Sequence, residues 1–387
     1  MTSAIPFDAG LLDRLMDEAG IDVLFATSKH NVQYLLGGYR FFFFDSMDAI
    51  GVSRYLPVLV YPKGMPEKAA YFGSGMESFE HELGRFWPSH VETTAWGTID
   101  AIDQASSYIR ALLPAPRIGI EMSFLPLDAG LRLQKNVPAA ELVDAFFALE
   151  RLRAIKTPTE IDCLRTASEE VVAAMLGALE QCKAGMTKVD FVHVLKREQV
   201  ARGLAFDYCL ITAGSSHNRA PSPQQIVQGD ILSIDSGANF RGYIGDLARM
   251  GIVGEPDTEL RSLLAVVDAV QQNARSTIKP GTTGTSVYAA AGEVINETSH
   301  APCIHFMAHG MGLVSHEAPR LWSNNPVPYS GYDQDRPLQA GMVVSVETTM
   351  SHPTRGYVKL EDTILVTEDG HESLGDGGRG WNVAGQG

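Results

Sequence analysis

The sequence predicts two domains, an α/β N-terminal domain over residues 1–152 and an α+β C-terminal domain over residues 153–387. Three observations support this prediction. Helical and strand patterns alternate along the first part, which is typical of an α/β layer. Near residue 150 the pattern changes to a long helical period. Beyond it, helices and strand-rich sections follow one another in groups, and the length of 387 residues suggests two or three domains.

Apolar periodicity defines the elements of the first domain in order. Residues 11–20, LLDRLMDEAG, have the period of an amphipathic helix, and the apolar run VLFA at 23–26 predicts a strand after it. Two further buried strands are predicted at 57–61 and 117–121, with a helix between them at 101–113.

The run FFFF at residues 41–44 predicts a strand that is covered on both faces. Alternate side chains of a strand face opposite ways, so one covered face buries only two of the four rings. The other two need a second partner inside the domain, in a ligand site or in another subunit. We favour an active-site wall or a dimer interface.

The second domain begins with LRAIKTPTEIDC, residues 152–163. Thr157 and Pro158 followed by Glu160 are typical of a helix start, so the boundary falls between about residues 150 and 157. Two helices and a strand-rich section are expected next. They are followed by helices near 257–277 and 283–297, strands near 343–348 and 358–366, and a Gly-rich tail, 375–387, that we expect to be mobile.

Charge and composition exclude several classes of function. The formal net charge is −15 with no basic stretch, which excludes nucleic acid and an anionic membrane surface as partners. The N-terminus lacks the pattern of a signal peptide, and no apolar run of about twenty residues predicts a membrane span. The four cysteines lack CxxC spacing and are expected to be unpaired thiols, so we expect a soluble cytoplasmic protein.

Four acidic residues lie in strand-like, apolar surroundings. Asp235 and Asp246 end two β-like patterns joined by a Gly-containing turn, and a hairpin would bring both carboxylates together. Glu347 and Glu361 lie inside the apolar stretches GMVVSVETTM and GYVKLEDTILVT. Each alone is more simply a turn former, a cap or a solvent-facing side chain. Together they require cations, because a buried carboxylate is unfavourable unless it is paired, and we expect hardly any lysine or arginine nearby to neutralise them.

Two divalent ions would balance these four charges, with His309 as a neutral nitrogen ligand. Oxygen-rich sites with one imidazole suit Mn²⁺, Fe²⁺, Co²⁺ or Zn²⁺, and geometry alone does not choose among them. The segment HGMGLVSHE, residues 309–317, contains two glycines that disfavour a helix. In an extended segment, the seven-residue spacing would direct His309 and His316 to opposite faces, one toward metal and one toward substrate.

The order D-x10-D, HGMGLVSHE, VSVE and KLEDTILVTEDG resembles that of the pita-bread metallohydrolases, including methionine and Xaa-Pro aminopeptidases, prolidase and creatinase. The resemblance covers essentially the whole chain. Residues 152–167 resemble the entry to the catalytic domain of the prolidase and creatinase branch, and the preceding 150 residues resemble the N-terminal domain of that branch. It implies a creatinase/prolidase-like N-terminal domain and a pita-bread catalytic domain. Creatinase itself uses no metal centre and lacks the full ligand set. This sequence keeps all five ligand residues, which disfavours a metal-free mechanism.

The resemblance also implies roles for the site residues. Asp235 would chelate one metal, Asp246 and Glu361 would bridge both, and His309 and Glu347 would ligate the second. Two metals about 3.5–4 Å apart would hold a bridging hydroxide that attacks the amide carbonyl. Glu347 would accept the proton of the metal-bound water, and His316 would stabilise the oxyanion.

Two positions depart from the family pattern. His217 lies near the position of a substrate histidine, but the loop before it is shorter than in peptidases, and His217-Asn218 resembles the creatinase side. Lys359 stands where prolidase-like members carry arginine, and lysine cannot form the same bidentate fork with a carboxylate. His305 is expected to be either a second-layer or a core residue.

The predicted function is hydrolysis of the bond before proline in a dipeptide or short peptide, in a homodimer. A second possibility keeps the metals but acts on a small non-peptide substrate, as an ectoine- or creatine-like amide hydrolase or a dimethylsulfoniopropionate lyase. The third is a non-catalytic binding protein on the same fold, which retention of all five ligands disfavours.

Overall fold

A computed structural model describes residues 5–49 and 51–385, and these form two compact units, Met1–Arg153 and Ala154–Gly387. The division falls one residue from the predicted boundary. Among the described residues, no helix is long and apolar enough to span a membrane. Each unit is described separately below.

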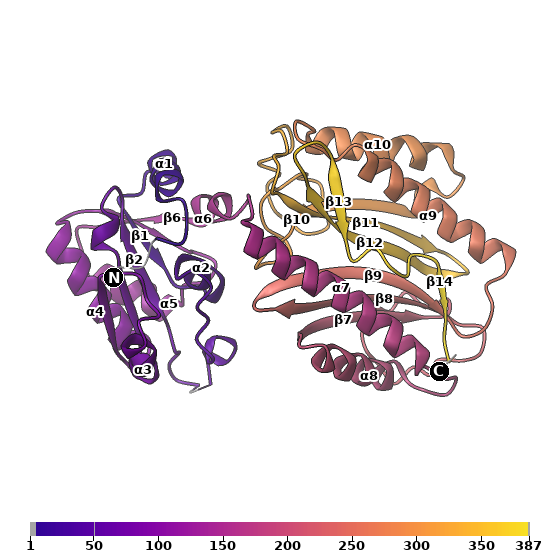
Figure 1. Ribbon diagram of the computed structural model, residues 1–387, viewed down its shortest axis with the longest axis horizontal. Coiled ribbons are helices and arrows are strands. Elements are labelled where there is room, and N and C mark those ends of the chain that lie inside the picture. Colours follow the sequence, from indigo (N-terminus) through magenta and orange to yellow (C-terminus); the bar gives the residue numbers. More distant parts are fainter. Residues whose placement is uncertain (1–4, 50, 386–387) are drawn as a thin grey trace. The chain divides into compact units, whose positions relative to one another are not determined.

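The first unit is a mixed sheet between two layers of helices (Figure 1). Its strand order is β4-β3-β2-β1-β5-β6, and apolar clusters cover both faces of the sheet. The predicted α/β layer is therefore confirmed. Its elements are α1 (Ala9–Ala19), β1 (Val23–Ala26), α2 (Lys29–Leu35), β2 (Val58–Pro62), β3 (Ala70–Ser74), α3 (Ser78–Glu82), β4 (His90–Ala95), α4 (Thr98–Leu112), β5 (Arg117–Ile120), α5 (Leu127–Asn136), β6 (Glu141–Asp144) and α6 (Phe146–Leu152).

The FFFF run is not a strand, and that prediction was wrong. Residues 42–43 form a turn, and a short 3₁₀ helix, Phe44–Ser46, follows. Phe41 and Phe44 are buried while the Phe42 side chain is 70% exposed, so the unit itself covers two rings. Edge-to-face packing of Phe41 on Phe44, with ring centroids 5.8 Å apart, replaces the expected alternation.

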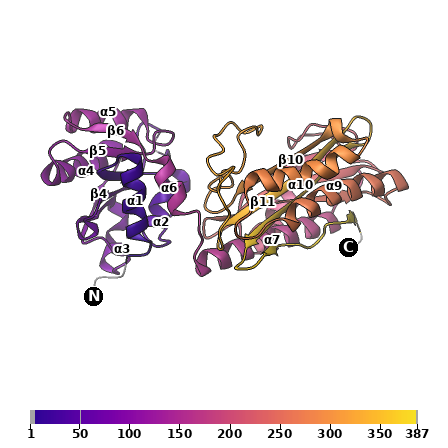
Figure 2. The ribbon, with the colours of Figure 1, turned by 90° about the horizontal axis from the view of Figure 1, so that it is seen from above.

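The second unit is a curved antiparallel sheet covered by four helices. Its main strand order is β10-β11-β12-β9-β8-β7, with β13 beside β12 and β14 beside β9. The helices α7 and α8 pack along β7–β9, and α9 and α10 pack along β10–β12 (Figures 1 and 2). Its elements are α7 (Pro158–Glu180), α8 (Lys188–Ala201), β7 (Ala205–Ala213), β8 (Ile231–Phe240), β9 (Tyr243–Ile252), α9 (Thr258–Ser276), α10 (Gly284–Glu297), β10 (Ile304–Gly310), β11 (Val343–His352), β12 (Gly356–Val366), β13 (His371–Leu374) and β14 (Trp381–Val383).

Local sequence signals account for the entry into this unit. Thr157 caps α7 by accepting from the Glu160 backbone N–H, while the Glu160 side chain accepts from the Thr157 backbone N–H. Pro158 starts the helix, as predicted. At Gly245 a Cβ atom would lie 2.6 Å from the Ala167 carbonyl oxygen of α7, so glycine allows this helix to lie directly against β9.

Candidate metal centre and active site

Five neighbouring strands bring the five predicted metal ligands to the face of the second sheet that the helices leave uncovered. Asp235 and Asp246 come from the hairpin β8–β9, in which Asp246 pairs with Gly237 and Asp235 with Ala248. His309 lies near the end of β10, and Glu347 and Glu361 are directly opposite each other on β11 and β12. The predicted hairpin and the convergence of the five residues are both observed.

The ligands form two overlapping groups that share Glu361. Ligand atoms of Asp246, His309 and Glu361 lie within 4.8 Å of one another, and so do those of Asp235, Glu347 and Glu361. All five side chains are buried. The sequence assigned Asp246 as a second bridging residue, and in the structure it groups with His309 and Glu361.

One ring nitrogen of His309 indicates that these groups fit metal ions. Its Nδ1 lies 3.2 Å from the Gly310 carbonyl oxygen, whereas its buried Nε2 has no hydrogen-bond partner. That Nε2 is 3.7 Å from a Glu361 oxygen and 4.0 Å from a Glu347 oxygen. A buried nitrogen without a partner, facing carboxylate oxygens, is suited to bind a divalent cation.

The pKa shifts of the four carboxyl groups also indicate that the site favours bound cations. Burial raises the pKa of Asp235, Glu347 and, most strongly, Asp246, and the neighbouring carboxylate of Glu361 adds to each rise. Burial also opposes the charge on Glu361, but Lys359 and His309 hold its pKa below the usual value. One buried ammonium cannot compensate four buried carboxylates, so divalent ions would stabilise the ionised forms.

The expectation that hardly any cationic side chain lies near these carboxylates was wrong. The Lys359 Nζ lies 2.5 Å from Asp235 and 2.9 Å from Glu361, and it also pairs with Glu347. Burial opposes the charge on Lys359, yet the three carboxylates hold its pKa well above the usual value. Arg219 donates to Asp235 from the loop after β7. Lys359 is recognisable in the sequence as a departure from the family pattern, but it was not predicted to lie beside the carboxylates, although alternation puts residues 359 and 361 on the same face.

The two histidines of HGMGLVSHE do not face opposite ways, which corrects the prediction from their spacing. Their rings are stacked, with centroids 3.8 Å apart and an interplanar angle of 16°. The segment is not continuously extended, because β10 ends at Gly310 and the chain folds back to pair Gly310 with Glu317. His316 therefore lies over His309 and lines the cavity beside the carboxylates.

Two glycines and a buried ion pair hold this fold-back in place. A Cβ atom at Gly310 would collide with the backbone of Glu317 and Ala318, and one at Gly312 would collide with the Glu317 carboxylate. The glycines thus admit the returning chain rather than a metal ion. Glu317 is 2.9 Å from the Lys156 Nζ, and both side chains are 1% exposed, so this pair anchors the loop that carries His316.

His217 lies apart from the metal ligands. It is exposed, and its Nε2 is 3.1 Å from the carbonyl oxygen of His352 at the end of β11. It is not among the residues that line the cavity over the carboxylates, whereas His305 is among them. The structure thus supports no direct contact of His217 with a substrate in this cavity, and its substrate role stays a prediction.

The cavity over the carboxylates has a volume of about 420 Å³. Besides the four carboxylate ligands, its walls include Tyr208, Arg219, His316 and Tyr357. Sequence reasoning missed Tyr208, whose hydroxyl donates to Asp246, and also Arg219 and Tyr357. Arg219 follows His217 by two residues, and its nearness to a candidate site histidine could have identified it. No feature of the segment around Tyr208 indicates a place in the site.

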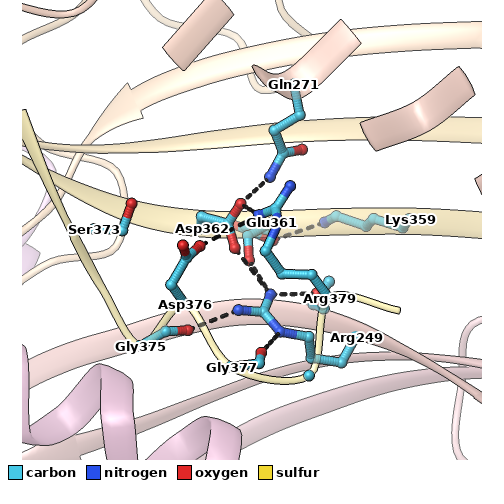
Figure 3. Close-up of polar contacts among 12 residues, drawn as sticks. Arg249, Gln271, Lys359, Glu361, Asp362, Ser373, Gly375, Asp376, Gly377 and Arg379 are labelled. Carbon is cyan, nitrogen blue, oxygen red and sulfur yellow. Dashed lines mark hydrogen bonds and ion pairs between the residues drawn. The ribbon is translucent and has the colours of Figure 1, made fainter. Parts of the chain in front are cut away.

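The opposite face of β12 carries a different charge cluster (Figure 3). Asp362 is 3.0 Å from Arg249 and 3.2 Å from Arg275, and it also pairs with Arg379. Arg249 donates to the Gly375 and Gly377 carbonyl groups, which fixes the start of the tail. The prediction of a mobile tail is therefore wrong for residues 375–385, which include the strand β14.

Comparisons with known proteins identify the family and the two domains. Residues 162–368 match the family model of metallopeptidase family M24, and residues 11–155 match that of the creatinase/prolidase N-terminal domain. An uncharacterised peptidase of Bacillus subtilis and a Xaa-Pro dipeptidase of Pyrococcus furiosus are each 28% identical, and each match covers 94% of this chain and 96% of the relative.

Solved structures show the same two-domain fold. A Xaa-Pro dipeptidase from Bacillus anthracis has a TM-score of 0.81 at 24% identity, covering 97% of this chain and 98% of that chain. A prolidase from Pyrococcus furiosus has a TM-score of 0.75 at 26% identity, covering 94% of this chain and 99% of that chain. The predicted creatinase/prolidase-like and pita-bread domains are confirmed.

Proposed function

Because this chain belongs to metallopeptidase family M24, we propose that it hydrolyses the bond before proline in a dipeptide or short peptide. The observation that carries the proposal is the buried His309 Nε2, which lacks a partner and faces the carboxylates of two ligand groups. Two relatives named Xaa-Pro dipeptidase, each 28% identical over more than nine-tenths of the chain, supply the substrate class.

Divalent ions, when bound, supply a Lewis acid and lower the pKa of water toward about 7. Asp235, Asp246, His309, Glu347 and Glu361 would hold them. Mn²⁺ is our preferred metal, because four carboxylates and one imidazole form an oxygen-rich ligand set.

Glu347 is the proposed acceptor of the proton that the attacking water loses. It lies at the edge of the cavity, and burial together with the neighbouring Glu361 raises its pKa, which suits a group that accepts a proton near neutral pH. The same carboxylate then donates the proton to the leaving nitrogen of proline, so the residue returns to its starting state.

His316 is the proposed hydrogen-bond donor to the substrate carbonyl oxygen. Burial, with the neighbouring His309, lowers the pKa of His316 to about 3, so its ring is neutral at pH 7. One nitrogen of a neutral imidazole carries a proton, and Tyr329 lies 3.5 Å from Nδ1. The ring can thus stabilise an oxyanion without adding a positive charge beside the metals.

We further propose a cytoplasmic homodimer. All four cysteines are unpaired thiols, which suits a reducing compartment. The exposed Phe42 ring is the surface feature that favours a partner subunit or a bound ligand beside the first unit.

The test is mass-spectrometric detection of products from Mn²⁺-loaded protein, offered Xaa-Pro dipeptides and tripeptides beside ectoine and creatine. Release of free proline or of a proline-containing fragment is the expected result. The matched control is the same set of peptides with alanine in place of proline. Cleavage of ectoine or creatine, with intact peptides, would replace the proposal with the small-amide alternative. No product from any substrate, at full metal loading, would favour the binding-protein alternative.

A further inference from the structure

The ammonium group of Lys359 lies inside one of the two ligand groups. Its Nζ is 2.5 Å from an Asp235 oxygen and 2.9 Å from a Glu361 oxygen, and it pairs with the third member, Glu347. Its side chain is 4% exposed. An ammonium has three N–H donors, so one lysine satisfies one oxygen of each carboxylate in this group.

In the other ligand group, Lys359 contacts only the shared Glu361. Asp246 accepts from the Tyr208 hydroxyl, and His309 Nε2 has no hydrogen-bond partner. Within residues 5–49 and 51–385, no lysine or arginine forms an ion pair with Asp246. The two positions are therefore unequal, because the ammonium contacts all three carboxylates of one group and only the shared Glu361 of the other.

The charge balance of the site increases the difference between the two positions in their affinity for an ion. The four carboxylates carry four negative charges, and Lys359 with Arg219 compensates two of them. One divalent ion neutralises the remainder, whereas a second ion would leave an excess of positive charge in a buried site. That excess is unfavourable in a low dielectric unless the ammonium moves away.

The residue type at position 359 matters for the same reason. Lysine ends in a compact point charge on a flexible four-carbon stem, whereas arginine ends in a planar fork. The ammonium fits among three carboxylate oxygens, as an ion does, while a guanidinium binds carboxylates side-on. Lysine at this position is thus suited to compete with an ion for the same oxygens.

We propose that Lys359 is a built-in competitor for the second metal ion of this centre. The group of Asp246, His309 and Glu361 fills first and tightly. The group of Asp235, Glu347 and Glu361 accepts an ion only when the Lys359 ammonium is displaced. This inference rests on the proposed metal centre but not on the proposed substrate.

The experiment is calorimetric titration of chelator-treated, full-length protein with Mn²⁺, together with electron paramagnetic resonance to detect coupled Mn²⁺ pairs. Wild-type protein should bind one ion per chain tightly and a second about 10- to 100-fold more weakly, by analogy with the effect of residues adjacent to metal ligands. Coupled pairs should appear only as the weak site fills. Two ions bound with equal affinity would overturn the proposal, and this arm needs no variant.

Lys359→Met keeps an unbranched side chain that is one atom shorter, and it removes the charge. In that variant the second ion should bind about 10- to 100-fold more tightly than in wild type, with coupled pairs at lower Mn²⁺ concentration. Lys359→Arg is the variant to use if the methionine form does not fold. It keeps the charge but not the compact ammonium, and it should also tighten the second site. An unchanged second affinity in a folded variant would overturn the proposal.

Arg219→Met is the matched control, because it removes a positive charge from the same Asp235 without emptying the Lys359 position. Its effect on the second affinity should be clearly smaller than that of Lys359→Met. Equal effects would mean that overall charge, and not occupancy, governs the site, and would overturn the proposal. Failure of wild type to bind any Mn²⁺ would instead reject the metal centre on which both proposals depend.

Discussion

The two faces of strand β12 present opposite electrostatic problems. On the open face, Glu361 shares a buried site with three other carboxylates, and Lys359 and Arg219 are the cationic side chains that contact them. On the helix-covered face, the next residue, Asp362, is surrounded by three arginines from α9, β9 and the C-terminal tail.

The difference teaches how to separate a structural cluster from a functional one. On the covered face the chain itself supplies partners for its buried charges. Arginine side chains pair with Asp362, and carbonyl groups such as those of Gly375 and Gly377 accept hydrogen bonds from Arg249 (Figure 3). On the open face an excess of negative charge remains and a ring nitrogen of His309 has no partner. An excess that the protein does not compensate, next to a cavity, indicates a site for ions.

The largest expected effect is a loss of turnover at the open face. Glu347→Gln removes the proton acceptor while it keeps the shape of the side chain, so turnover should fall by about 10²- to 10⁴-fold. Thermal unfolding should remain close to that of wild type. The measurement is kcat/KM at saturating Mn²⁺, with metal content recorded. A wild-type rate at full metal loading would reject the role assigned to Glu347.

A substitution on the covered face should instead lower the free energy of unfolding. Arg249→Met removes a fully buried partner of Asp362, and loss of one member of a buried ion pair costs about 3–5 kcal/mol. Denaturant unfolding measures this loss. The control is Arg261→Met, which removes an exposed partner of Glu255 and should change the free energy of unfolding by less than about 0.5 kcal/mol. Similar values for the two variants would contradict the structural role of the cluster.

His316→Ala tests the cavity wall rather than the ligands. Loss of one oxyanion donor should lower kcat by about 10²- to 10³-fold. Metal content should be unchanged, because His316 stacks on His309 without belonging to either ligand group. Loss of an ion from this variant would show that the two histidines have been assigned wrongly.

Metal removal gives the smallest effect and compares the two faces in one experiment. Mn²⁺ at a hundred times its Kd should raise the free energy of unfolding by about 2.7 kcal/mol over the chelated protein. Mn²⁺ should raise the free energy of unfolding of Arg249→Met by the same amount, although the chelated variant starts from a lower value, because the substitution lies on the other face of β12. An increment that disappears in Arg249→Met would mean that the two faces are coupled.

Much of this centre could be predicted from local signals. The β-patterns around Asp235 and Asp246, with a turn that in the structure takes left-handed backbone at Arg241 and Gly242, were enough to predict the hairpin and its shared face. Short apolar strands likewise revealed Glu347 and Glu361. These predictions succeed because strand period and turn chemistry act within about twenty residues.

Two of the errors involve contacts that are distant in the sequence. The stacking of His316 on His309 depends on a loop anchored by Lys156 and Glu317, which are 161 residues apart. The ordered tail depends on Arg249, more than a hundred residues earlier. Spacing along one segment cannot predict where a distant buried charge will hold that segment.

Strand β12 also limits how a gene for this protein can vary. Substitutions at residues 359–362 change one face at a time, and a compensating change on a neighbouring strand can follow. A single-codon insertion or deletion there would exchange the faces, turning Asp362 toward the cavity and Glu361 toward the arginines. Related sequences should therefore differ in residue type within this strand far more readily than in its length.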